Sequence, residues 1–339
     1  MQNTSIAPPP PPSLAHQNAD LDARAAALTE AQLTDARHAA GLATGFPYPP
    51  NNPIFYIKFG NQPRDLTLME ARTHRFVFDE LEKMRRHGDM HDACDNRDQD
   101  AYGREAGQIP HIPRILRVVE TGMAAFIIME FIHGATLLDH SATQQQLDQV
   151  AGAIRTLLAI RVPPNTPPGP YQGGLISHPL FKNGRAPKTF SSITDLEVHI
   201  QMICDAPQRK RTSDIPRLDL ERRLCVVHAD PYPGNFLFDA MGRLFVLDFG
   251  DAALLPPSFQ SYALCFPNPK SAALARSVWS RLALELPHGN LATMARAAAL
   301  FARCQTYYED GNSTRYTTRK EEPQEVQRVA TFSLKLKFY

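Results

Sequence analysis

The sequence has few cysteines, and none of them stands at a spacing typical of disulfide frameworks or zinc sites. Five cysteines are scattered singly through 339 residues: Cys94, Cys204, Cys225, Cys265 and Cys304. An odd number without a C-x-x-C pair argues against both kinds of cross-link. We therefore expect reduced thiols and a cytoplasmic location.

The sequence also lacks an excess of either charge and lacks any long apolar run. Its 36 Lys and Arg residues nearly balance its 35 Asp and Glu residues, which leaves a net charge of +1. Such a balance gives no electrostatic basis for wholesale binding of nucleic acid. No stretch approaches the length of a membrane span, and no secretory signal is visible at the N-terminus. We expect no nucleic-acid or membrane partner, and the oligomeric state stays open.

Proline and alanine, by contrast, are plentiful near the N-terminus, and they divide it into three stretches. Residues 1–19 hold the run Pro8–Pro12 and little apolar material, which predicts a disordered tail. Residues 20–40 are rich in Ala and Leu with charged residues between them, which predicts one helix. The stretch 41–53 is rich in proline and is typical of turns.

The remainder of the first part is rich in strands. In chain order we expect a strand over 54–59, an amphipathic helix over 66–86, a long polar loop over 87–109, and strands over 115–119 and 124–132. The last strand is almost continuously apolar, so we expect it to be buried on both faces.

The second part is mainly helical. We expect helices over 143–160 and 194–205, short strands over 224–227, 235–238 and 244–247, and mostly helix over 271–308. A strand-rich part followed by a helix-rich part predicts an α+β fold of two lobes. Ligands favour the cleft between two such lobes.

The densest chemical signal lies in the segments 226–238 and 246–250. There Asp230, Asn235 and Asp248 stand at the ends of short apolar stretches, so their polar groups can converge at one edge. Hard oxygen ligands of this kind suit Mg²⁺, and a further carboxylate can accept or orient a hydroxyl proton. Asp248 follows four apolar residues, where an uncompensated carboxylate would be costly.

These residues form a recognisable pattern. H-x-D-x-x-x-x-N runs from His228 to Asn235, and D-F-G follows at 248–250, with the spacing of a kinase catalytic loop and metal-binding turn. Upstream, 55–60 holds a lysine strand and 127–134 a hinge-like segment. On these residues the chain resembles the aminoglycoside phosphotransferase and choline kinase-like family, including its fungal branch of uncharacterised members, over about residues 50–300.

The resemblance implies a fold and an activity. The fold would be protein-kinase-like, with a small antiparallel-sheet N-lobe within residues 20–132 and a mainly helical C-lobe over residues 133–339 that holds the catalytic loop and the acceptor pocket. The activity would be an ATP- and Mg²⁺-dependent phosphotransferase that acts on a hydroxyl (alcohol group) of a small molecule.

The resemblance also implies four residues on the nucleotide side. Lys58 would hold the α- and β-phosphates, and Glu70 would pair with its ammonium group. Backbone groups of the hinge from Glu130 to Ile132 would meet the adenine. Considered alone, Lys58 could be a surface lysine and Glu70 a solvated acid in a first helical turn.

Four more residues would make up the catalytic side. Asp230 would be the catalytic base or the group that orients the hydroxyl, with His228 supporting the loop. Asn235 and Asp248 would bind Mg²⁺, although Asp248 alone could be only a turn residue.

One departure from the family pattern leaves a second function open. Between Gly45 and Lys58 there is no glycine, only prolines and Asn51–Asn52, so no glycine-rich phosphate loop stands there. The alternative is therefore a catalytically weak or inactive kinase-like binding module. The acceptor is open too, because residues 251–339 are more basic than acidic, which disfavours a polycationic substrate.

Overall fold

The computed structural model describes residues 14–41, 43–60, 65–88, 109–122, 124–205, 217–307 and 315–318. The chain divides into two compact units. The first unit comprises residues 1–68 and 113–132, and the second comprises residues 69–112 and 133–339. Antiparallel sheets and helices both contribute, so the expected α+β class is confirmed.

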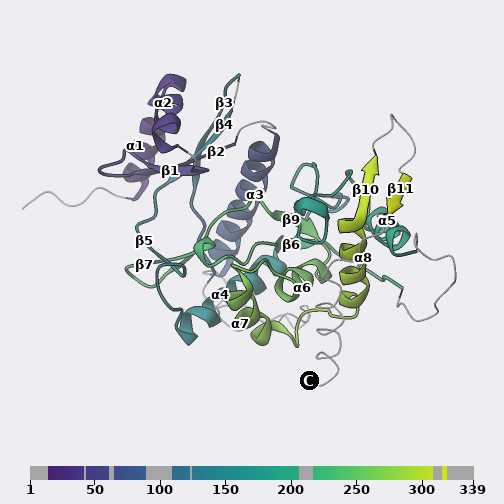
Figure 1. Cartoon of the computed structure of the whole chain (residues 1–339). Helices are drawn as coiled ribbons and strands as arrows, with labels where there is room; N and C mark the ends of the chain where they lie inside the picture. Colours follow the sequence, from purple (N-terminus) through teal and green to yellow (C-terminus); the bar gives the residue numbers. More distant parts are fainter. Residues whose placement is uncertain are drawn as a thin grey trace, which may run out of the picture. The chain divides into compact units, whose positions relative to one another are not determined.

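The first unit is built on a four-stranded antiparallel sheet in the order β1-β2-β4-β3 (Figure 1). Its strands are β1 (Gly45–Tyr48), β2 (Phe55–Gly60), β3 (Ile115–Glu120) and β4 (Ala125–Glu130). The last three confirm expected strands, but β1 lies in the stretch expected to hold only turns. It contains Pro47 and is an edge strand, where a missing N–H costs no ladder hydrogen bond.

Two helices, α1 (Leu14–Ala27) and α2 (Glu30–Ala40), replace the single helix expected over 20–40. The break occurs at Thr29, whose Oγ1 accepts a hydrogen bond from Gln32 N (3.3 Å) while Thr29 N donates to Gln32 Oε1 (2.9 Å). This reciprocal pair is a capping box, which starts a new helix. Since α1 begins at Leu14, the end of the expected tail is helical, and residues 1–13 lie outside the described residues.

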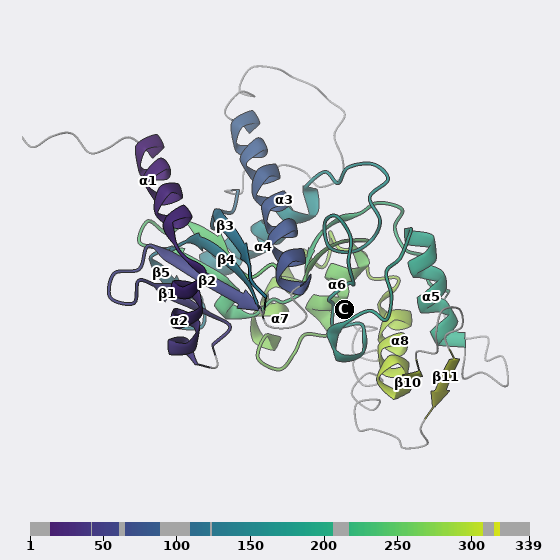
Figure 2. The same ribbon diagram turned by 90° about the horizontal axis from the view of Figure 1, so that it is seen from above.

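Helices α1 and α2 cover one face of the sheet (Figures 1 and 2). Leu28 and Leu33 pack there with apolar side chains of all four strands: Phe46, Phe55, Ile57, Phe59, Val119, Phe126 and Ile128. Arg117 Nη1 donates to three carbonyls at the end of α1, at 2.8–3.2 Å. Such capping satisfies carbonyls that the helix itself leaves unpaired.

The second unit holds most of the helices: α3 (Asp65–Gly88, entering from the first unit), α4 (Gln144–Ala159), α5 (Ile193–Asp205), α6 (Ser258–Cys265), α7 (Ala272–Leu282), α8 (Leu291–Arg303), and the 3-10 turns η1 (Lys182–Gly184) and η2 (Pro233–Asn235). The helices expected over 66–86, 143–160 and 194–205 are confirmed. The helical stretch expected to reach residue 308 ends at Arg303, where β10 (Cys304–Tyr307) pairs with β11 (Arg315–Thr318). The loop expected over 87–109 lies mostly outside the described residues.

Short strands form two small sheets in this unit. They are β5 (Gly134–Thr136), β7 (Phe236–Asp239) and β8 (Leu244–Val246) in one antiparallel sheet, and β6 (Cys225–His228) paired with β9 (Ala252–Leu255) in the other. The three strands expected over 224–227, 235–238 and 244–247 are therefore confirmed.

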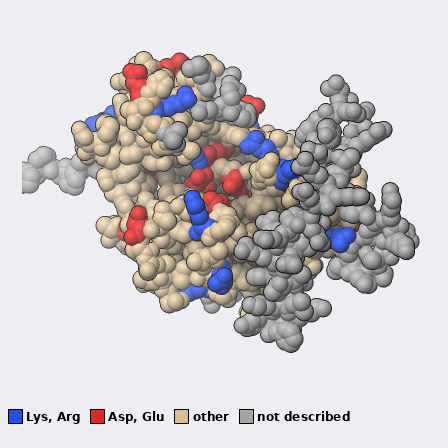
Figure 3. Space-filling model, viewed as in Figure 1, with Lys and Arg blue, Asp and Glu red and all other residues tan. Residues whose placement is uncertain are grey.

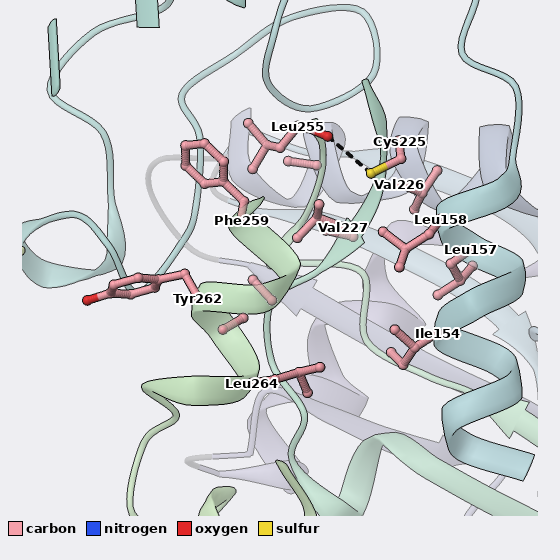
Figure 4. Close-up of a cluster of buried hydrophobic side chains, with 14 of the residues drawn as sticks. Ile154, Leu157, Leu158, Cys225, Val226, Val227, Leu255, Phe259, Tyr262 and Leu264 are labelled. Atoms are coloured by element: carbon pink, nitrogen blue, oxygen red, sulfur yellow. Dashed lines mark hydrogen bonds between the residues drawn. The ribbon is translucent and has the colours of Figure 1, made fainter. Parts of the chain in front are cut away.

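Strand β6 runs through the core of the second unit. Figure 4 shows its side chains among those of α4 and α6, namely Ile154, Leu157, Leu158, Phe259, Tyr262 and Leu264. Cys225 Sγ donates to Leu255 O (3.2 Å), and burial raises the pKa of this thiol to about 12. The thiol is thus a core group, as its isolated position in the sequence indicates.

Candidate active site

The strand pairing of the second unit brings several strand ends to one edge. Strand β6 ends at His228 and β8 ends at Val246, while β7 and β9 begin beside those ends because each pairs antiparallel. These two pairs of strands belong to separate sheets, and two contacts join their ends: His228 Nε2 lies 3.1 Å from Leu247 O, and Asn235 Nδ2 donates to Asp230 Oδ2 (3.1 Å). The polar residues that follow β6 and β8 therefore lie in one region.

The Asp230 carboxylate receives hydrogen bonds from three side chains. Asn235 Nδ2 donates to Oδ2 (3.1 Å) and also to the Asp230 carbonyl (3.1 Å). Asn268 Nδ2 and Ser271 Oγ both donate to the other oxygen, Oδ1, at 3.4 Å and 3.3 Å. The carboxylate is thereby held from both sides.

Burial raises the pKa of the Asp230 carboxyl above its ordinary value. His228 and the hydrogen bond from Asn235 oppose the rise, whereas the neighbouring Asp251 and Asp248 add to it. A carboxylate among other carboxylates is harder to ionise, and it is a better proton acceptor once ionised.

Asn235 is buried, with 6% of its surface exposed, and its amide orientation is fixed. Its Nδ2 is engaged twice by Asp230, so Oδ1 points away, and this oxygen makes no hydrogen bond to any described residue. An amide oxygen and a nearby carboxylate suit Mg²⁺, which is held by few protein ligands together with substrate phosphates. Within the described part of the chain, no group of three or more His, Cys, Asp or Glu side chains could hold a metal ion by itself.

Asp248 differs from expectation in its surroundings. It is exposed rather than embedded among the apolar residues before it, so the predicted desolvation cost does not arise. Its φ is +57°, a left-handed conformation two residues after the end of β8. Gly250 N donates to Asp248 Oδ1 (3.1 Å), which closes the turn.

Phe249 anchors this turn to helix α3. Its fully buried ring lies 4.8 Å from the ring of His74 and meets the ring of His228 edge-on at 5.6 Å. Glu70 is one helical turn before His74 and so shares its face. A Cβ placed on Gly250 would lie 3.2 Å from Asp248 Oδ1 and 3.5 Å from Glu70 Oε2, so both carboxylates border the same point.

His228 supports the loop through its backbone and its ring. The backbone N–H of His228 donates to Gln260 Oε1 (3.0 Å), and Gln260 Nε2 donates to the His228 carbonyl (3.2 Å). The side-chain amide of this buried glutamine thus makes the two hydrogen bonds that a neighbouring strand would make. The ring Nε2 lies 3.1 Å from Leu247 O, which assigns the proton to Nε2. The other nitrogen, Nδ1, is buried without a hydrogen-bond partner among the described residues.

Three predicted site residues belong to the first unit. Lys58 is half-buried on the sheet face opposite to the one covered by α1 and α2, and it stands across from Gly45 in the ladder. Glu130 N donates to Arg114 O (3.1 Å), and Glu130 Oε1 accepts from Arg114 N (2.8 Å). The N–H of Ile132 makes no hydrogen bond to a described residue.

The sequence matches the model of one protein family, the phosphotransferase enzyme family (APH), over residues 52–300. The chain belongs to this family. The match includes β2 with Lys58, the strand edge with Asp230, and all of α7. Among curated proteins, none matches the chain.

Solved structures similar to this member of the phosphotransferase enzyme family include three aminoglycoside-type enzymes. One is a thermostable mutant of aminoglycoside phosphotransferase APH(4)-Ia in a ternary complex with ADP and hygromycin B, at 15% identity, covering 73% of this chain and 77% of that chain, with a TM-score of 0.42. The gentamicin–APH(2")-IIa complex has 15% identity, 80% and 86% coverage and a TM-score of 0.40. The AMP-bound spectinomycin phosphotransferase APH(9)-Ia has 14% identity, 73% and 76% coverage and a TM-score of 0.37.

Three polar residues beside this candidate site were not predicted: Gln260, Asn268 and Ser271. Each reaches the loop from a distant point in the sequence, so spacing carries no trace of it. The one local signal is Asn268, which precedes α7 by four residues and resembles a helix-start residue.

One face of this phosphotransferase is mixed in charge where its residues are described (Figure 3). On the face drawn in Figure 3, the Lys and Arg side chains of the described residues are scattered rather than gathered into one basic region.

Among the described helices, none has the length and apolar character needed to cross a lipid bilayer.

Proposed function

We propose that the chain transfers the γ-phosphoryl group of ATP, in the presence of Mg²⁺, to a hydroxyl group of a small molecule. The observation that carries the proposal is the convergence of Asp230, Asn235 and Asp248 at one strand edge. A base, an amide oxygen and a carboxylate in this order are the parts of a kinase site that hold the metal and the acceptor hydroxyl. Family membership supports the phosphoryl chemistry.

On the metal side, we assign Asn235 Oδ1 and the exposed Asp248 carboxylate as the ligands of Mg²⁺. When bound, the ion neutralises charge on the phosphates. Asn235 can present its oxygen because Asp230 engages its Nδ2. Asp248 can present its carboxylate because the residue is exposed.

On the hydroxyl side, we assign Asp230 to accept the hydrogen bond of the acceptor and, as the new bond to phosphorus forms, its proton. His228 has no direct part; it fixes the loop through Gln260 and Leu247. Positioning and charge neutralisation then supply most of the rate enhancement, because phosphoryl transfer needs little covalent help from the protein.

On the nucleotide side, we assign Lys58 to the α- and β-phosphates and Glu70 to the orientation of its ammonium group. The face of β2 that carries Lys58 is the one that α1 and α2 leave uncovered. We assign the adenine to the backbone of Glu130 and Ile132, whose N–H is available.

Calorimetry with Mg-ATP, followed by a screen for ADP release, tests the proposal. The screen uses hydroxylated metabolites, choline analogues and aminoglycosides. We expect Mg-ATP binding that Asp248→Ala abolishes, and ADP release that falls at least about 100-fold in Asp230→Asn. The proposal is wrong if the wild-type protein does not bind Mg-ATP and Asp248→Ala changes nothing.

A kinase-like module that binds without turnover is the second candidate. One observation favours it: the turn between β1 and β2 carries Pro49, Pro50 and Pro53 and no glycine. Backbone N–H groups that could cradle a phosphate are therefore scarce there. Slow ADP release that disappears in Asp230→Asn would exclude this candidate.

A further inference from the structure

The start of helix α7 is bound to the Asp230 carboxylate by two side chains from one short segment. Asn268 Nδ2 and Ser271 Oγ lie 3.4 Å and 3.3 Å from the same oxygen, Oδ1. Ser271 is fully buried, and its hydroxyl reaches a residue 41 positions earlier in the chain. Neither residue belongs to the catalytic-loop pattern.

Ser271 occupies a position where serine ordinarily serves its own helix. It is the N-cap of α7, yet its side chain makes no capping hydrogen bond. At an N-cap the hydroxyl commonly accepts from a backbone N–H two or three residues later. Here it donates to Asp230 instead, so its hydrogen-bonding capacity is directed at the site.

The side-chain amide of Asn268 is oriented by the backbone of Ser271. Ser271 N donates to Asn268 Oδ1 (3.0 Å), which fixes which end of the amide faces the helix. The opposite end, Nδ2, must then face away from that N–H, and it faces Asp230. One amide thus couples the start of α7 to the carboxylate.

The two oxygens of Asp230 are therefore used unequally. Oδ1 receives two donors, whereas Oδ2 receives one, from Asn235. A carboxylate oxygen has two lone-pair directions, so Oδ1 is filled and Oδ2 retains one. An incoming hydroxyl therefore finds an unused lone-pair direction at Oδ2.

We propose that Asn268 and Ser271 are positioning residues that lock the Asp230 carboxylate, so that Oδ2 meets the acceptor hydroxyl. The inference rests on the proposed function. In the transfer, the acceptor oxygen bonds to the γ-phosphorus while the bond from that phosphorus to the β,γ-bridging oxygen breaks. The hydroxyl proton passes to Oδ2, and ADP leaves with the bridging oxygen.

Two substitutions separate this role from a structural one. Asn268→Asp keeps the hydrogen bond from Ser271 N, since a carboxylate also accepts it, but it removes the donor and adds a charge beside Asp230. Ser271→Ala removes only the hydroxyl. Ser277→Ala is the control, because this hydroxyl of α7 bonds only to its own helix, at Ala273 O (3.1 Å).

The measurement is steady-state ADP release by the full chain with Mg-ATP, first with water as acceptor and then with any acceptor from the screen. We expect kcat to fall about tenfold in Asn268→Asp and in Ser271→Ala, with KM for ATP within about twofold of wild type. Ser271→Thr, which restores a hydroxyl, should recover part of kcat. Ser277→Ala should match wild type in both parameters.

The outcomes distinguish this inference from the function on which it rests. If the wild type shows turnover and both substitutions leave kcat unchanged, the positioning role is overturned and the phosphotransferase stands. The role is also overturned if the substitutions lower the unfolding temperature and raise KM without lowering kcat. A wild type without any turnover would overturn both proposals together.

Discussion

At the scale of single residues, the turn from Asp248 to Gly250 leaves little room for a side chain at its last position. A Cβ on Gly250 would stand 3.2 Å from Asp248 Oδ1, closer than ordinary van der Waals contact. The φ of Gly250 is not in the left-handed region, so its backbone conformation does not favour glycine. What favours glycine here is the short distance between a side chain at this position and the Asp248 carboxylate.

We therefore expect Gly250→Ala to displace the Asp248 carboxylate while leaving the fold intact. Mg²⁺-dependent ADP release should fall at least about tenfold, because small displacements at a site cost rate steeply. A titration of activity against Mg²⁺ measures the change. Gly152→Ala is the matched control: a Cβ there meets nothing within 4 Å, and alanine in the middle of α4 should raise stability by about 0.5–1 kcal/mol. Unchanged Mg²⁺ dependence in Gly250→Ala would contradict the steric argument.

The sequence pattern proposes the residues of this candidate site but says little about their environments. His228, Asp230, Asn235 and Asp248 follow a fixed spacing, and the structure brings them together at one strand edge. The exposure of Asp248 could not be predicted, because the apolar residues before it suggested burial. The residue also has a left-handed φ, which the sequence pattern does not encode.

At the scale of elements, helix α6 joins the core to the candidate site. All eight of its residues are buried, and it carries Gln260, the partner of the His228 backbone. Its first residue is bound by Glu221: Ser258 N donates to Oε2 (3.1 Å) and Ser258 Oγ donates to Oε1 (2.7 Å). A carboxylate at this end also interacts favourably with the helix dipole.

We expect Glu221→Ala to lower the free energy of unfolding by about 1–3 kcal/mol, since two buried donors lose a charged acceptor. Glu221→Gln, which keeps an oxygen but loses the charge, should cost about half as much. Urea denaturation followed by circular dichroism measures both. Lys83→Gln, which removes an ion pair from the exposed side of α3, should leave the urea midpoint unchanged. Equal effects in Glu221→Gln and Lys83→Gln would contradict this role of Glu221.

Elements with clear periodicity were predictable, and the rest were not. Helices α3, α4 and α5 each bury one face, so apolar spacing reveals them. Helix α6 is buried on every side and shows no such period, which is why the sequence did not predict it. The break between α1 and α2 was detectable from Thr29 and Gln32, a capping-box pair three residues apart.

At the scale of the whole molecule, the stability of the second unit should depend on His178. This histidine is buried, its Nε2 lies 3.0 Å from Phe259 O, and Leu180 N donates to its Nδ1 (3.1 Å). Burial lowers its pKa from 6.5 to about 3, so the folded protein keeps the ring neutral.

Because the folded pKa lies below the unfolded one, the unfolded chain binds a proton that the folded chain does not. The stability supplied by the neutral ring is present above pH 6.5 and is lost as the pH falls toward 3, by about 1.4 kcal/mol per pH unit. We expect His178→Gln to flatten this dependence, measured as unfolding free energy between pH 7 and pH 4. His140→Gln, on an exposed residue, should keep the wild-type slope. A slope in His178→Gln as steep as in the wild type would contradict the assignment.

Helices α1 and α2, which cover one face of the first sheet, determine where the protein can be truncated for expression. The family match begins at residue 52, beyond α1, α2 and β1, so a fragment trimmed to the match would lack all three. It would leave Phe55, Ile57 and Phe126 bare on one face and turn β2 into an open edge. An exposed apolar face and an unpaired edge strand both promote association between chains, so such a fragment should aggregate during expression. A fragment that stays in solution has to begin before α1.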